Sequence, residues 1–264
     1  MARRVANALV LITAGSNCDR ETISALEMAG AMVSPVHIND LIAGKVSMSR
    51  YQILVLPGGF TFGDDISSGR VLANKIKAHL SKDFKAFVKE GKLVLGICNG
   101  FQALVKMGLL PNLGKKQKQE VTLTFNNTAR FEDRWVYLAG NLNSPCVFTR
   151  ELHRTLYLPI AHAEGRFVVD KPATLKQLKK GGQIVFQYAG ADGRTIDDSV
   201  NPNGSTANIA GICDASGRIF GMMPHPERYV NRLQHPRWTR ESLPDVGDGL
   251  VIFQNAVEYA LNEL

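Results

Sequence analysis

Long apolar segments are absent from this chain of 264 residues. Runs such as Leu9–Ile12 and Ile53–Leu56 fall far short of the ~20 residues that a membrane-spanning helix needs. The start, Met1–Arg4, is basic, but neither a long apolar run nor a small-residue cleavage site follows it. We therefore expect no membrane partner and no secretion signal, and we predict a cytoplasmic protein.

Cysteine is scarce too, with four residues at positions 18, 98, 146 and 213 and no C-x-x-C pair. Because no pair of histidines lies near them in sequence, the spacing gives no support for a zinc site, and we predict no metal. Thiols in a cytoplasmic chain stay reduced. Their reactivity depends on their setting, since a buried thiol is inert and one at a helix N-terminus is activated.

Repeats, proline-rich linkers and low-complexity segments are also missing. With 45% hydrophobic and 21% charged residues, the composition is that of a globular protein with a sizeable core, which excludes disorder, collagen and coiled coil. Lysine and arginine number 31 against 24 acidic residues, but they are scattered. The one basic run, Lys115–Lys118, has no interleaved aromatic residues and is typical of a solvated loop, so we expect no nucleic-acid partner.

Apolar runs alternate with helical periodicity through the first hundred residues, as in β-α units around a parallel sheet. The pattern predicts strands at residues 5–12, 32–38, 52–56 and 93–97 and helices at 20–29, within 72–88 and directly after 98. From residue 121 onward, short β-rich runs predict antiparallel or edge strands at 121–124, 135–138, 156–160, 184–188, 208–213 and 219–223. A last helix is predicted at 249–261.

The most specific local feature is a cysteine between two glycines where a predicted strand meets a predicted helix, in Gly96-Ile97-Cys98-Asn99-Gly100. This G-x-C-x-G pattern is typical of a nucleophile elbow, whose sharp turn needs glycines because neighbouring backbones approach closely. The helix N-terminus favours the thiolate. Cys98 is therefore the candidate nucleophile, and the alternative is a cysteine that merely packs at the strand end.

A cysteine nucleophile needs a base, and two His-x-Glu pairs offer one. His225 follows a predicted strand, and Glu227 would point the same way in an extended segment and orient the imidazole. His162 and Glu164 form a competing pair, also after an apolar run. Spacing does not choose between the pairs, and a loop histidine beside a solvated acid is the alternative for each.

Acyl transfer also needs amide donors that face a developing oxyanion. Pro57-Gly58-Gly59 follows a predicted strand, where an unhindered glycine N–H can face the elbow. The second donor is the N–H of Asn99, the residue after the nucleophile. On its own the Pro-Gly-Gly segment indicates only a turn. Its interpretation as an oxyanion donor depends on the elbow at Cys98.

These motifs, in this order, resemble the class I (triad) glutamine amidotransferases. Further segments narrow the resemblance to the glutaminase of phosphoribosylformylglycinamidine synthase: Gly15–Asp19, Gly58–Asp64, Cys98–Gly100, Ala161–Gly165, Asn201–Ser205 and Met222–Arg228. The resemblance covers most of the chain. It implies one three-layer α/β domain over residues 1–264, flavodoxin-like, with a mostly parallel central sheet and additional antiparallel edge strands.

The resemblance also implies roles for residues. The catalytic ones are the nucleophile Cys98, the general base and acid His225, and the orienting carboxylate Glu227. The substrate-binding ones are Gly59 and Asn99 at the oxyanion and Gln102 on the glutamine. It implies a secondary pair near the site, His162 and Glu164, whose role the residues do not reveal.

The activity implied by the resemblance is glutamine hydrolysis through a Cys98 thioester, with ammonia passed to a synthetase subunit. That partner would use ATP to convert formylglycinamide ribonucleotide into its amidine in de novo purine biosynthesis, with a small third subunit left open. No Gly-x-x-x-x-Gly-Lys-Ser/Thr loop is present, so ATP and Mg are expected on the synthetase and no cofactor here. The alternatives are a glutaminase that serves another ATP-dependent amidating synthetase and a non-catalytic flavodoxin-like module.

Overall fold

The computed structural model describes residues 4–114, 118–194 and 198–264. Residues 1–3 and 115–117, which hold most of the basic N-terminal start and of the basic run, lie outside this set, so the predictions made on them stay predictions. Within it, no helix has the length and apolar character needed to cross a membrane.

The main sheet has nine strands in the described part of the chain, in the order β2-β1-β3-β4-β11-β10-β9-β6-β7. Their bounds are β1 Asn7–Ile12, β2 Met32–His37, β3 Ile53–Leu56, β4 Leu93–Ile97, β6 Glu132–Gly140, β7 Leu156–His162, β9 Ile184–Ala189, β10 Ile209–Cys213 and β11 Ile219–Met222. In this spatial order the first five strands, β2, β1, β3, β4 and β11, pair in parallel. The pairs that join β11, β10, β9, β6 and β7 are antiparallel. A separate antiparallel pair joins β5 Val121–Thr124 and β8 Arg166–Val169.

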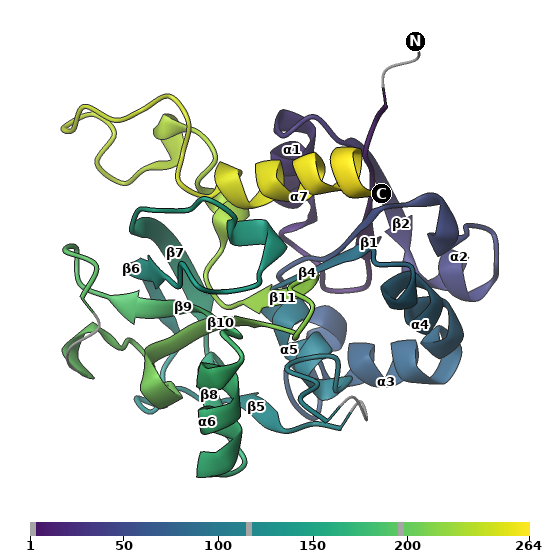
Figure 1. Cartoon of the computed structure of the whole chain (residues 1–264), viewed down its shortest axis with the longest axis horizontal. Coiled ribbons are helices and arrows are strands. Elements are labelled where there is room, and N and C mark those ends of the chain that lie inside the picture. The colour runs from purple at the N-terminus through teal and green to yellow at the C-terminus, as the bar shows by residue number, and fades with distance from the viewer. Residues whose placement is uncertain (1–3, 115–117, 195–197) are drawn as a thin grey trace.

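Helices cover both faces of the parallel half of the sheet, which gives the three layers that the resemblance implies (Figure 1). Their bounds are α1 Asp19–Met28, α2 Ile38–Ile42, α3 Arg70–His79, α4 Ser81–Lys89, α5 Asn99–Lys106, α6 Pro172–Lys180 and α7 Leu250–Glu263. In Figure 1, α1 and α7 lie above the sheet and α3, α4 and α5 below it. The single α/β domain with a parallel core and antiparallel strands is thus confirmed.

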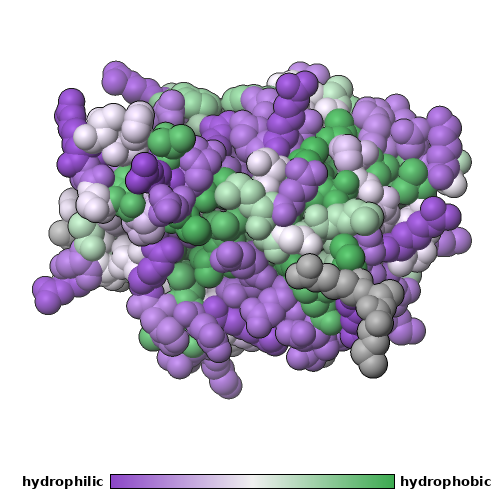
Figure 2. All heavy atoms as spheres, turned by 90° about the horizontal axis from the view of Figure 1, so that it is seen from above, coloured by the Kyte–Doolittle hydropathy of each residue, from purple (hydrophilic) through white to green (hydrophobic). Residues whose placement is uncertain are grey.

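The core lies along β4 and α5, the two elements that flank Cys98. Every residue of both elements is buried. A strand in the middle of a parallel sheet has helices on both faces, so its side chains need to be apolar throughout rather than alternate. The surface is different: seen from above the view of Figure 1, polar and charged side chains fill most of the periphery, and apolar ones gather toward the middle (Figure 2).

Three elements were not predicted: α2, β8 and α6. Helix α6 buries only Thr174 and Leu178, so its sequence carries too little apolar periodicity to stand out. Strand β8 has four residues, of which Phe167 alone is fully buried, and its place depends on β5. Helix α2 has only five residues, too few for a helical period to show in the sequence, and β8 depends on a partner strand that is distant in sequence, which the local pattern does not record.

Candidate active site

Cys98 lies at the sharp turn from β4 into α5. Its φ of 49° and ψ of −104° place it in a region that non-glycine residues rarely occupy, as expected of a strained elbow. Its backbone N–H donates to Met222 O at 2.8 Å, which ties the turn to β11. The thiol sulfur lies 3.8 Å from Ala161 O at the end of β7. The residue is 5% exposed, so the thiol is almost fully enclosed by protein.

The glycines on either side make this turn possible. A Cβ added to Gly96 would lie 2.6 Å from Leu104 Cδ1, and one added to Gly100 would lie 1.9 Å from Leu56 O. The second clash is with backbone, which cannot rotate away. The glycine requirement inferred from the sequence therefore follows from close packing of α5 on β3 and β4.

We expect Gly100→Ala to destabilise the protein by at least the ~1–3 kcal/mol typical of overpacking, because Leu56 O must move. Chemical denaturation measures the change. Gly140→Ala is the matched control, since its Cβ would make ordinary contacts of 3.6 Å or more. Equal stability of the two variants would contradict the packing argument.

His225 and Glu227 form the closest acid–imidazole pair of the site. Glu227 Oε1 lies 2.6 Å from His225 Nδ1, and both side chains are buried. The segment is not extended: Pro226–Arg228 is one turn of 3-10 helix, and this turn brings the carboxylate onto the ring. His225 Nε2 has no hydrogen-bond partner among the described residues.

The charge state of His225 depends on its neighbours. Burial disfavours the imidazolium, but the charges of Glu227 and Cys98 outweigh burial and raise the pKa of His225 well above its usual value. A charged imidazole beside a thiol favours an imidazolium–thiolate pair. The arrangement thus offers a nucleophile together with a proton donor.

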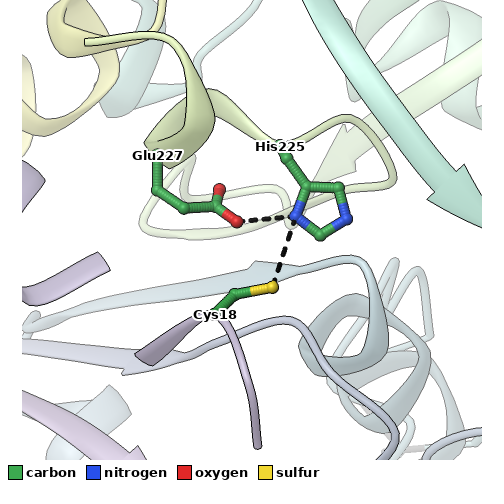
Figure 3. A group of neighbouring side chains, drawn as sticks. All are labelled: Cys18, His225 and Glu227. Carbon is green, nitrogen blue, oxygen red and sulfur yellow. Dashed lines mark hydrogen bonds and ion pairs between the residues drawn. The ribbon is translucent and has the colours of Figure 1, made fainter. Parts of the chain in front are cut away.

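Cys18 is a second thiol beside the same imidazole (Figure 3). Its sulfur lies 3.9 Å from His225 Nδ1, and Arg228 Nη2 lies 3.0 Å from it. Cys18, His225 and Glu227 are close enough to hold a metal ion. The guanidinium of Arg228 repels a cation there, and Glu227 already occupies Nδ1 of the ring, so these residues fit a metal poorly.

The competing pair does not have this geometry. Glu164 turns away from His162 and accepts hydrogen bonds from the backbone N–H and the hydroxyl of Ser68, the latter at 2.9 Å. Its backbone O accepts from Gln102 Nε2 at 2.7 Å. The structure therefore separates the two His-x-Glu pairs that spacing could not, because only one of them brings carboxylate and imidazole together.

Gly59 lies beside the turn that follows β3, with a φ of 148° that favours glycine. The bridge with residues 15–17 uses the N–H groups of Asn17 and Phe60 as donors and leaves the Gly59 N–H out of the bridge. Asn99 is the first residue of α5, and the first N–H groups of a helix have no partner within it. The two predicted oxyanion donors, the backbone N–H groups of Gly59 and Asn99, are thus used neither by the bridge to residues 15–17 nor by the hydrogen bonds within α5.

Asn99 and Gln102 also belong to a buried polar network on α5. Asn99 Nδ2 donates to Asp64 Oδ1 at 2.8 Å and to Gln102 Oε1 at 3.0 Å, and its Oδ1 accepts from Thr61. The Gln102 amide is held by Asn99 and Glu164, and these two bonds use one of its two N–H groups and one of the two lone pairs of its oxygen. Its predicted contact with glutamine stays a prediction.

A buried lysine anchors the loop that follows Asp64. Lys106 Nζ, on the last turn of α5, donates to Ser68 O at 2.5 Å. Burial lowers the pKa of Lys106, and the charge of Glu164 opposes this. Burial raises the pKa of Asp64. Residues 64–68 are therefore held against α5 by hydrogen bonds between buried polar groups.

The Asn201–Ser205 segment is hydrogen-bonded to the start of β8. Ser205 Oγ accepts from Phe167 N at 2.9 Å, and Gly204 O accepts from Arg166 Nε at 3.1 Å. These bonds fix the start of β8 and hence the Ala161–Gly165 segment before it.

Four residues of the site were not predicted from the sequence: Cys18, Ser68, Asn126 and Arg228. Cys18 and Arg228 lie within segments that carry the family resemblance, but no role was predicted for either residue.

The chain matches the model of the CobB/CobQ-like glutamine amidotransferase domain over residues 5–260. It is 50% identical to phosphoribosylformylglycinamidine synthase subunit PurQ of Dehalococcoides mccartyi, over 96% of both chains. It is 45% identical to the subunit of that name from Methanococcus maripaludis, strain C5, over 97% of this chain and 98% of the relative.

Solved structures agree with these relatives. The structure of PurLQS from Thermotoga maritima contains a chain with a TM-score of 0.73 and 32% identity, covering 97% of this chain and 99% of that one. Another glutamine amidotransferase from Thermotoga maritima, 14% identical with a TM-score of 0.54 over 98% of this chain and 100% of that one, shares the fold. The chain therefore belongs to the CobB/CobQ-like glutamine amidotransferase family and, within it, to the PurQ subunits of phosphoribosylformylglycinamidine synthase.

Proposed function

We propose that this chain is the glutaminase subunit of a phosphoribosylformylglycinamidine synthase. It hydrolyses glutamine to glutamate and ammonia, and the ammonia serves a synthetase subunit that converts formylglycinamide ribonucleotide into formylglycinamidine ribonucleotide with ATP. The observation that carries the chemistry is the buried pair of His225 Nδ1 and Glu227 Oε1, 2.6 Å apart, beside the strained Cys98 elbow.

In the first half-reaction, the Cys98 thiolate attacks the side-chain carbonyl carbon of glutamine. The new C–S bond forms as the C=O electrons move to oxygen, and the N–H groups of Gly59 and Asn99 hold this oxyanion. When the intermediate collapses, the C–N bond breaks and His225 Nε2 gives its proton to the leaving nitrogen. Ammonia departs, and a glutamyl thioester remains on Cys98.

In the second half-reaction, His225 is neutral and takes a proton from water. The hydroxide attacks the thioester and the C–S bond breaks, which restores the thiolate and the imidazolium. The new carboxyl group loses its proton to solvent, and glutamate leaves. Glu227 stabilises the imidazolium in both halves and fixes the ring so that Nε2 is the nitrogen that exchanges protons.

The relatives' names and the PurLQS structure support a synthetase partner. We propose that a small third subunit joins the two. We propose that residues 1–264 form one glutaminase domain with no metal or cofactor of its own, and that ATP and Mg bind on the synthetase. We also propose a cytoplasmic location, because purine precursors are made where ATP and glutamine are abundant.

The test is co-purification from the source cell, followed by turnover with glutamine labelled with ¹⁵N in its side-chain amide. We expect a synthetase that binds formylglycinamide ribonucleotide to accompany the chain and ¹⁵N to appear in the amidine. Label in the product of a different amidating synthetase would favour the alternative acceptor. Absence of any glutamine turnover in the purified complex would favour a non-catalytic module.

A further inference from the structure

His162 is a buried histidine next to the catalytic loop that the mechanism above does not use. Its ring is 3% exposed, and a Cβ added to Gly165 would lie 2.1–2.4 Å from three of its atoms, so Gly165 makes room for the imidazole. Nδ1 lies 3.1 Å from Asn126 Oδ1. Nε2 is buried and has no hydrogen-bond partner among the described residues.

The hydrogen bonds of Asn126 settle which ring nitrogen carries the proton. Asn126 Nδ2 donates to Arg130 O and to His162 O, both at 2.8 Å, which fixes the orientation of the amide. Its Oδ1 also accepts from Gly165 N at 3.1 Å, so this oxygen is an acceptor. Nδ1 of His162 must therefore be the donor, and Nε2 of the neutral ring carries a free lone pair.

The charge state agrees with this tautomer. Burial, helped by the charge of His225, lowers the pKa of His162 to about 4. The ring has no carboxylate partner to oppose this, since Glu164 is bonded to Ser68. At neutral pH the site thus holds two imidazoles with opposite roles: His225, which donates, and His162, which accepts.

The segment that carries His162 also borders the reacting groups. Ala161 O lies 3.8 Å from Cys98 Sγ, and Glu164 O holds the amide of Gln102. His225 N donates to Pro159 O, three residues before His162, at 2.9 Å. His162 therefore lies between two residues that contact the elbow, on the strand to which the catalytic loop is bonded.

We propose that His162 Nε2 accepts a hydrogen bond from the nitrogen that leaves the tetrahedral intermediate and holds it as neutral ammonia before it moves to the synthetase. This inference rests on the proposed function. Ammonia has three N–H donors, and a buried acceptor without a partner gains a full hydrogen bond by receiving one. His162 is a positioning residue here, because it forms and breaks no covalent bond.

A neutral acceptor suits ammonia better than a charged group does. Ammonia reacts with the synthetase's substrate through its lone pair, which a proton would block. A ring that is uncharged at neutral pH cannot supply that proton, whereas a second imidazolium would. His225 has already given its proton to the leaving nitrogen, which forms neutral ammonia, so neither ring then converts ammonia to ammonium.

Two variants distinguish the contributions of the two ring nitrogens of His162. The amide nitrogen of asparagine stands at the position of Nδ1, so His162→Asn keeps the bond to Asn126 and removes the acceptor. Glutamine reaches one bond further, so His162→Gln restores an acceptor at the position of Nε2. In the intact complex we expect H162N to lower the ratio of amidine to glutamate by about 3- to 10-fold, the value of one hydrogen bond, and H162Q to restore most of it.

Ammonium-supported amidation is the control and should be unchanged in both variants, because it bypasses the glutaminase. A wild-type ratio in H162N, or an equal loss in H162Q and H162N, would overturn the proposal. ¹⁵N NMR of the wild-type ring needs no variant to fold: we expect a neutral ring with Nδ1 protonated at pH 7, and a doubly protonated ring would overturn the proposal as well. The proposed function fails separately, by loss of glutamine-dependent amidation in the wild-type complex.

Discussion

Replacing Cys98 by alanine should abolish glutamine-dependent amidation, with a loss on the order of 10⁶-fold as for other removed nucleophiles. No other thiol can take over. Cys18 is held by Arg228 on the Nδ1 side of His225, the side that Glu227 occupies, and lacks the elbow geometry. Ammonium-dependent amidation by the same complex should remain, because the synthetase makes the amidine from ammonia. Both rates are measured on one preparation.

Cys213→Ala is the matched control for this variant, since Cys213 is also buried but lies on β10, with Ser144 Oγ 3.7 Å away. It should keep glutamine-dependent activity close to wild type. Retention of glutamine-dependent amidation by Cys98→Ala would contradict the thioester mechanism. Loss of both activities would instead indicate a damaged complex, which thermal unfolding of the subunit would reveal.

Glu227→Gln should lower kcat for glutamine hydrolysis by about 10⁴-fold, the effect of neutralising the orienting carboxylate in a triad. Glutamine can keep a bond to His225 Nδ1 but cannot stabilise the imidazolium. Glu227 and Cys98 raise the pKa of His225, so removing the carboxylate's charge lowers that pKa. The charged ring that donates the proton then survives only at lower pH, and the residual activity should move toward acid.

The pH–rate profile of glutamine hydrolysis checks this shift. Glu164→Gln is the control, because its carboxylate bonds Ser68 and not an imidazole, and an amide oxygen can still accept those bonds. We expect that variant to lose less than about 10-fold, as for a single hydrogen bond. A larger loss in Glu164→Gln than in Glu227→Gln would show that the wrong pair was assigned.

The elbow was predictable from sequence because its physics is local. The apolar strand, the two glycines and the start of the helix all lie within residues 93–106. The structure places Cys98 at the strained turn between the strand and the helix. The parallel half of the sheet was predictable for the same reason. Its inner strands β1, β3, β4 and β11 carry continuous or nearly continuous apolar runs, as burial under helices on both faces requires, whereas the edge strand β2 does not.

The choice between the histidines was not local. His225 and His162 both precede a glutamate by two residues, and the difference arises from what each carboxylate meets. A 3-10 turn brings Glu227 onto His225, whereas Ser68, nearly a hundred residues away in sequence, takes Glu164. Cys18 was missed because nothing near residue 18 indicates the loop at residues 225–228 that packs against it.

The most direct test of the central claim is to trap the acyl-enzyme. The wild-type complex is mixed with glutamine, quenched in acid during the first turnover, and digested, and the peptides are examined by mass spectrometry. We predict a glutamyl thioester on the peptide that contains Cys98, absent from Cys98→Ala and longer-lived in Glu227→Gln. Rapid glutamate formation with no adduct on Cys98, or with the adduct on another cysteine, would contradict the account.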